Sequence, residues 1–115
     1  MTQRMWHTQT DGDTVTLARA LPARFDVSAS ASFPMLARTR LAHQIRQDMW
    51  RALQNIRGFS PVVRVERSDA GLRVTAGGRV PKPISKHIAE RIEVLLNDEV
   101  LRARWIKCAQ VRMTG

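Results

Sequence analysis

The sequence predicts an α+β protein in which a small antiparallel sheet packs against two main helices. Short segments at 25–33, 61–67 and 72–76 alternate apolar and polar side chains, which is the period of a half-buried strand. Longer segments at 35–57 and 84–97 repeat apolar side chains every three or four residues, which is the period of an amphipathic helix. The chain has 115 residues, 43% hydrophobic and 25% charged, and this usage is typical of a single globular domain.

The first clearly patterned segment is a strand that ends at Pro34. Single polar residues separate its apolar side chains, which are Phe25, Val27, Ala29, Ala31 and Phe33. The alternative is a flexible linker, because alanine and serine are small and have poor strand propensity. A further short strand is expected at 14–17, and Pro22 limits its extension.

The N-terminus differs in kind from the rest of the chain. Its first ten residues are largely polar, and Asp11-Gly12-Asp13 is a turn signal. We therefore expect residues 1–13 to be a mobile N-terminal segment and residues 14–115 to form a single α+β domain.

The segment 35–57 carries the strongest helical pattern. Gly58 is well placed to end this helix, since glycine adopts the backbone conformation common after a helix C-terminus. Apolar residues at helical spacing are Leu41, Ile45, Met49, Ala52, Leu53 and Ile56.

A β-hairpin is expected next, with strands at 61–67 and 72–76. Gly71 would supply a positive φ at the turn. Gly77 and Gly78 are expected to break the second strand before the chain turns toward the next helix.

The helix expected at 84–97 is followed by a segment, 99–113, whose pattern fits either a helix or a strand. A final strand would give the order β-α-β-β-α-β, which is the ferredoxin-like arrangement. A final helix would instead give a sheet flanked by helices with a helical C-terminus. Both alternatives stay open from the sequence.

The chain is strongly basic, and this charge is the main indication of a partner. Its 19 Lys and Arg against 10 Asp and Glu give a formal net charge of +9. Arginine suits phosphate and carboxylate recognition, so the bias favours an anionic partner such as nucleic acid. A GC-rich genome would produce the same arginine and alanine usage without any such function.

Two features are candidate anion-binding sites. The first is the polar face of the helix at 35–57, where arginine alternates with glutamine in a way that suits phosphates and base edges; an ordinary solvated face explains it too. The second is the glycine-bearing basic loop at 77–83 that leads into the next helix, whose free backbone N–H groups favour an anion. The candidate residues are Arg38, Arg40, Arg46, Gln47 and Arg51 on the helix, with Arg79, Lys82 and Lys86 at the loop.

No catalytic or metal-binding motif is present in the sequence, so we expect neither an enzyme nor a cofactor. The three histidines are far apart and lack metal-ligand spacing. Glu90 and Glu93 are interleaved with cations, which favours solvated ion pairs over an acid–base pair. Cys108 lies beside Lys107, but a lone cysteine is more often a small packing residue than a reactive thiol.

Cytoplasmic residence is the expected location. No apolar stretch approaches the roughly 18 residues of a membrane span, and the N-terminus has no signal-peptide pattern. The leading hypothesis is a binding module that contacts nucleic acid through its phosphates, without a base-stacking platform on the hairpin strands. The alternative is an accessory or assembly protein that docks on an acidic protein surface. A homodimer is compatible with either, because exposed sheet edges often pair.

Overall fold

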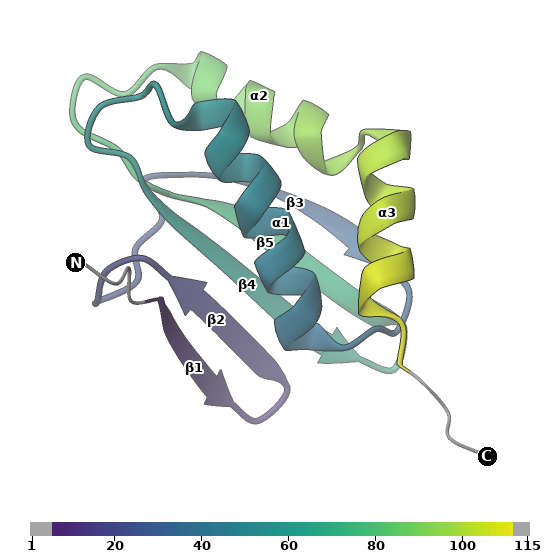
Figure 1. Cartoon of the computed structure of the whole chain (residues 1–115). Coiled ribbons are helices and arrows are strands. Elements are labelled where there is room, and N and C mark those ends of the chain that lie inside the picture. The colour runs from purple at the N-terminus through teal and green to yellow at the C-terminus, as the bar shows by residue number, and fades with distance from the viewer. Residues whose placement is uncertain (1–5, 112–115) are drawn as a thin grey trace, which may run out of the picture.

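The computed structural model describes residues 6–111 and contains a five-stranded antiparallel sheet with three helices (Figure 1). The predicted α+β class is therefore confirmed. In chain order the elements are β1 (His7–Asp11), β2 (Thr14–Ala18), β3 (Val27–Phe33), α1 (Arg38–Leu53), β4 (Ser60–Ser68), β5 (Gly71–Arg79), α2 (Lys86–Leu96) and α3 (Glu99–Ala109).

The sheet order is β1-β2-β4-β5-β3, and every neighbouring pair is antiparallel. Strands β3 and β4 are therefore parallel to each other, with β5 between them and α1 as their connection. This part, from β3 to α2, loosely resembles the ferredoxin-like arrangement. The resemblance ends there, because the C-terminal segment forms α3 and the β1–β2 hairpin extends the sheet beside β4.

The N-terminal segment contains a strand that the sequence analysis did not predict. His7–Asp11 forms β1, which pairs with β2 from His7 opposite Ala18 to Asp11 opposite Thr14. Residues 7–11 of the segment expected to be mobile, 1–13, thus form a strand, while residues 1–5 lie outside the described residues. Strand β1 consists of polar residues and is mostly exposed, so it has no apolar alternation to indicate it.

The hairpin formed by β4 and β5 is longer than predicted, because Gly77 and Gly78 do not break β5. A Cβ on Gly77 would lie 2.0 Å from the carbonyl oxygen of Val27, and one on Gly78 would lie 2.1 Å from that of Ser60. These glycines allow the neighbouring backbones to approach closely, which is a known role of glycine inside a strand. Gly71 has the predicted positive φ, at 122°.

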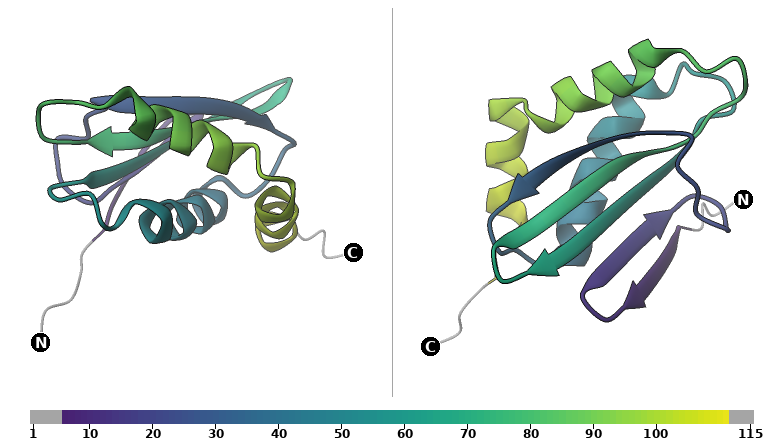
Figure 2. Two further views of the ribbon diagram at one scale, coloured as in Figure 1. Left: turned by 90° about the horizontal axis from the view of Figure 1, so that it is seen from above. Right: turned by 180° about the vertical axis from the view of Figure 1, so that it is seen from behind.

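The helices cover one face of the sheet (Figure 2). Helix α1 packs on β4, α2 lies over β3, and α3 packs against α1. In the apolar stripe predicted for the first helix, Leu41, Ile45, Met49 and Leu53 are buried. Ala52 of this stripe is exposed, and Ile56 is partly buried beyond the end of the helix. Among the described residues no helix is long and apolar enough to cross a membrane.

The opposite face of the sheet is polar. On this face, residues paired between neighbouring strands form a polar row across the whole sheet: Gln9, Thr16, Arg64, Thr75 and Ser30. An antiparallel sheet often has one packed and one solvated face, so this face needs no ligand to explain it.

A buried carboxylate connects α1 to α3. Asp48 is 7% exposed and is the one charged side chain that is buried among the described residues. It accepts a hydrogen bond of 2.6 Å from Nε1 of Trp105, and the Arg104 guanidinium donates to the same oxygen. Arg51 lies 3.8 Å from its other oxygen. Asp48 is thus a buried hydrogen-bond acceptor that joins the two helices.

Replacement of Asp48 by alanine should lower the free energy of unfolding by about 2–4 kcal/mol, because the Trp105 indole N–H would be left buried without an acceptor. Urea unfolding of the Asp48→Ala protein measures this loss. The Arg51→Ala protein is the control and should lose about 0–1 kcal/mol, since this arginine is largely exposed. Equal losses in the two proteins would contradict the assignment.

Candidate functional site

Three arginines of the basic face predicted on α1 have contacts within the protein. Arg38 donates a hydrogen bond of 3.1 Å to the carbonyl of Gly12 in the β1–β2 turn. The guanidinium of Arg46 lies 4.6 Å from the centre of the Trp6 ring. Arg51 faces the buried carboxylate of Asp48. Each of these three arginines has a contact within the protein, and Arg51 stays largely exposed.

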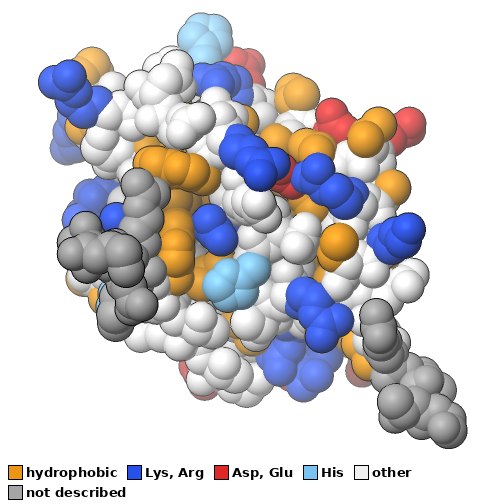
Figure 3. Space-filling model, viewed as in Figure 1, with side chains coloured by type: hydrophobic (Ala, Val, Ile, Leu, Met, Phe, Trp, Pro, Cys, Tyr) orange, Lys and Arg blue, Asp and Glu red, His pale blue; other side chains and the backbone are white. Residues whose placement is uncertain are grey.

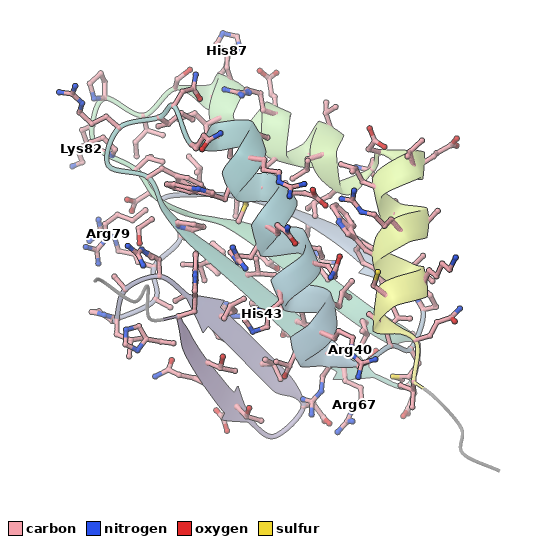
Figure 4. The ribbon with its side chains drawn as sticks, in the orientation of Figure 1. Arg40, His43, Arg67, Arg79, Lys82 and His87 are labelled. Carbon is pink, nitrogen blue, oxygen red and sulfur yellow. The ribbon has the colours of Figure 1, made fainter. Side chains whose placement is uncertain are left out.

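The remaining candidates on α1 are exposed but isolated. Arg40 donates a bond of 3.3 Å to the carbonyl of Gln110, and Gln47 is solvent-exposed. Figure 4 shows Arg40 at the opposite end of the molecule from Arg79 and Lys82. Figure 3 likewise shows the cationic side chains of the helical face as scattered groups. The polar face of α1 and the glycine-bearing loop at 77–83 thus do not form one continuous surface.

A different basic site forms where the β2–β3, α1–β4 and β5–α2 connections converge. They enclose a hollow of about 280 Å³, which we call the basic hollow. Gly58, with φ of 80°, lets the α1–β4 connection approach Pro81 of the β5–α2 loop. The residues that line the basic hollow are Arg24, Asp26, Gly58, Arg79, Val80, Pro81, Lys82 and Ile84.

Three cations and one carboxylate set the charge of the basic hollow. Asp26 accepts hydrogen bonds from Nε of Arg24 at 3.0 Å and from the amide of Val80 at 3.1 Å. The hydrogen bond from Arg24 is the main cause that lowers the pKa of Asp26, and the Val80 amide and the charge of Arg79 act in the same direction. Asp26 is therefore ionised at neutral pH, and the hollow keeps an excess of positive charge.

Arg79 and Lys82 are the available cations of the basic hollow. Neither side chain forms a hydrogen bond or an ion pair within the described part of the chain. The sequence analysis selected both residues, and the structure brings them together. Lys86, its third candidate at this loop, does not line the hollow and lies exposed on the first turn of α2.

Sequence reasoning did not identify Arg24 and Asp26. They lie in an N-terminal third whose charges balance, far along the chain from Arg79. No local pattern links them to the glycine-bearing loop. Only the pairing of β3 with β5, which places Val27 opposite Gly78, brings the two connections together.

The N-terminus of α2 is already capped. The Oγ of Ser85 accepts a hydrogen bond of 3.2 Å from the amide of His87. One of the backbone donors proposed for an anion is therefore used within the protein.

The side chains considered for catalysis do not gather into a reaction centre. Glu90 lies 3.0 Å from Nδ1 of His87, at the exposed start of α2. Cys108 is exposed on α3. Among residues 6–111 no group of three His, Cys, Asp or Glu side chains could hold a metal ion.

A second polar cluster lies between α1 and the N-terminal hairpin. Trp6 packs against the core between the guanidinium groups of Arg46 and Arg19, whose centres lie 4.6 and 5.8 Å from the ring. The Nε of Arg46 is buried without a hydrogen-bond partner in the described structure. His43, one turn before Arg46, points from α1 toward β2 (Figure 4). Desolvation and the charge of Arg46 lower the pKa of His43.

Comparisons of the chain with protein-family models, with curated proteins and with solved structures find no match. Evidence for its function therefore comes from the residues and their geometry.

The lowered pKa of His43 should make stability depend on pH. The unfolded chain binds this proton below the ordinary value of 6.5, whereas the folded protein resists it, so stability should fall with acidification from about pH 6.5 downward. Urea unfolding between about pH 5 and 7.5 measures the effect. The His43→Gln protein should show a flatter profile in this range. A profile identical to that of the wild type would refute the effect.

Proposed function

We propose that this chain is a non-enzymatic binding module whose basic hollow holds a phosphate group of an anionic partner, most simply nucleic acid. One observation carries the proposal: Arg24, Arg79 and Lys82, which come from two separate connections, line a single hollow with one carboxylate among them. Convergence of cations from distant segments is the electrostatic arrangement that phosphate recognition requires.

The residue types suit a phosphate better than a neutral ligand. Arginine offers a planar set of N–H donors, and lysine offers a compact positive charge. Asp26 occupies Nε and Nη2 of Arg24, which orients the guanidinium beside the hollow. Arg79 and Lys82 then supply charge that no acidic side chain in the described structure neutralises by a direct pair.

A further cation lies close in sequence to the residues that line the basic hollow. Arg57 is exposed in the α1–β4 connection, directly before Gly58. Acidic side chains lie at the turns of the opposite sheet end, where Asp13 pairs with Arg67 at 3.0 Å and Asp69 is exposed. The net charge of +9 would attract a polyanion, and the basic hollow would then offer a place for one of its phosphates.

A partner in the cytoplasm would suit the lone Cys108, which stays reduced there. An acidic protein surface could use the same charges, and the chain would then be an accessory or assembly protein. Retention of a discrete protein after nuclease treatment of a native lysate favours that alternative, whereas loss of the bound material after nuclease treatment favours nucleic acid.

Binding to mixed-sequence fluorescent oligonucleotides should weaken steeply between about 50 and 200 mM salt, because bound cations release counterions from phosphates. Fluorescence anisotropy measures the dissociation constant at each salt concentration. Single-stranded and duplex probes of several sequences distinguish phosphate binding from sequence recognition. Affinity that does not change with salt would exclude the electrostatic mechanism.

The Arg79→Gln/Lys82→Gln protein should bind about tenfold more weakly and lower the slope of log affinity against log salt by about two. The matched control, Arg40→Gln/Arg51→Gln, loses the same charge from α1 and should show only the small effect of reduced net charge. If the control loses affinity while the hollow variant keeps it, the site lies on α1 and the basic hollow is the wrong assignment. Circular dichroism checks that both proteins are folded.

A further inference from the structure

Strand β3 forms one edge of the sheet and is unusually open to pairing. Within the described residues it pairs only with β5. Natural edge strands are commonly protected by charged residues, by proline or by short length. Strand β3 spans seven residues, Val27–Phe33, without a charge or a proline, whereas the opposite edge strand β1 is shorter and carries His7 and Asp11.

Backbone groups of β3 point away from β5 at alternate residues. The carbonyl of Ser32 accepts a hydrogen bond of 2.7 Å from Arg102 of α3, so the polar groups of Ser32 face the open edge. Because backbone direction alternates along a strand, Ser28 and Ser30 present their N–H and C=O groups on the same side. The centre of the edge therefore offers donors and acceptors for another strand.

Helix α2 adds a charged surface beside this edge. It lies over β3, and its side toward α1 carries Arg91, which donates to the carbonyl of Ala52. The side away from α1 carries Lys86, Ala89 and Glu93, which share one helix face by their spacing. Lys86 and Glu93 are exposed, and neither side chain forms an ion pair in the described structure.

We propose that two copies of this chain associate through β3 about a two-fold axis. The two β3 strands would pair antiparallel, so the two sheets become continuous, and the two α2 helices would then lie antiparallel above the new pair. The axis would pass near Ala89, which lies between Lys86 and Glu93 on the helix face. Lys86 of each protomer would then face Glu93 of the other, which gives two ion pairs. The small side chain of Ala89 allows the helices to approach at the axis.

Charge complementarity identifies a second copy as the occupant. A two-fold axis places the start of α2 from one copy opposite the end of α2 from the other. Lys86 and Glu93 have opposite charges, so this arrangement brings unlike charges together. An unrelated peptide could use the strand edge but would have no reason to match this helix face. Lys86 lies outside the basic hollow, so the association does not depend on the proposed function.

Charge exchange on α2 tests the dimer. Sedimentation equilibrium or light scattering over a concentration series should show a dimer for the wild type. Lys86→Glu and Glu93→Lys each place two like-charge pairs across the axis and should raise the dissociation constant by about tenfold or more. The double variant restores unlike pairs and should dimerise like the wild type. An equimolar mixture of the two single variants should form a heterodimer, since each cross pair is then attractive.

Glu90→Lys is the matched control, because it makes the same charge change on the groove side of α2 and should leave the dimer intact. Ser30→Pro removes an edge-facing amide and should give a monomer, with circular dichroism as the check on folding. A monomeric wild type at all concentrations overturns the proposal. Dimerisation of both single variants at wild-type strength, or failure of the double variant to recover, overturns it as well.

Discussion

The arrangement of the helices depends on one buried carboxylate. Asp48 lies in the middle of α1 and receives the indole N–H of Trp105 from α3. A buried ion without partners is costly, so the hydrogen bonds from α3 are what make this position tolerable. Once Trp105 is seated, its ring lies 6.2 Å from that of Phe33 at the end of β3. One polar contact thereby links the C-terminal helix to both the first helix and the sheet.

Further contacts hold the C-terminal helix against the end of the sheet. Arg102, on the same helix, stacks 4.0 Å from the Phe33 ring centre and donates to the carbonyls of Leu96 and Ser32. Helix α3 therefore closes the end of β3 without covering its length. The edge strand keeps its middle open, and the connections at the other end of the sheet are left to form the basic hollow.

Elements with a strong apolar period were predictable from the sequence, and elements defined by long-range contacts were not. Strand β3, helix α1 and the β4–β5 hairpin each bury one face, and that face is visible as periodicity. Strand β1 buries almost nothing, so its pairing partner alone fixes its conformation. Gly77 resembles a strand breaker because the reason for it, the nearby carbonyl of Val27, belongs to another strand.

The residues of the candidate site also differ in how far the sequence could indicate them. Arg79 and Lys82 were identified because they share a short loop with glycine and proline, which a local pattern can show. The spacing of the α1 arginines gives the helix face but not the partners, such as Gly12 for Arg38, that the fold supplies. Arg24 could not be found, since sheet pairing alone brings it beside the loop.

The ion pair between Arg24 and Asp26 has a consequence for the anion that the basic hollow is proposed to bind. A carboxylate already holds part of this arginine and also accepts the Val80 amide that fixes the neighbouring loop. A monovalent carboxylate ligand would offer Arg24 little more than the acceptor it has. A phosphate group carries more charge and more acceptor oxygens, so it could bind beside Asp26 without replacing it. If the basic hollow binds an anion as proposed, its internal carboxylate would favour anions of high charge density.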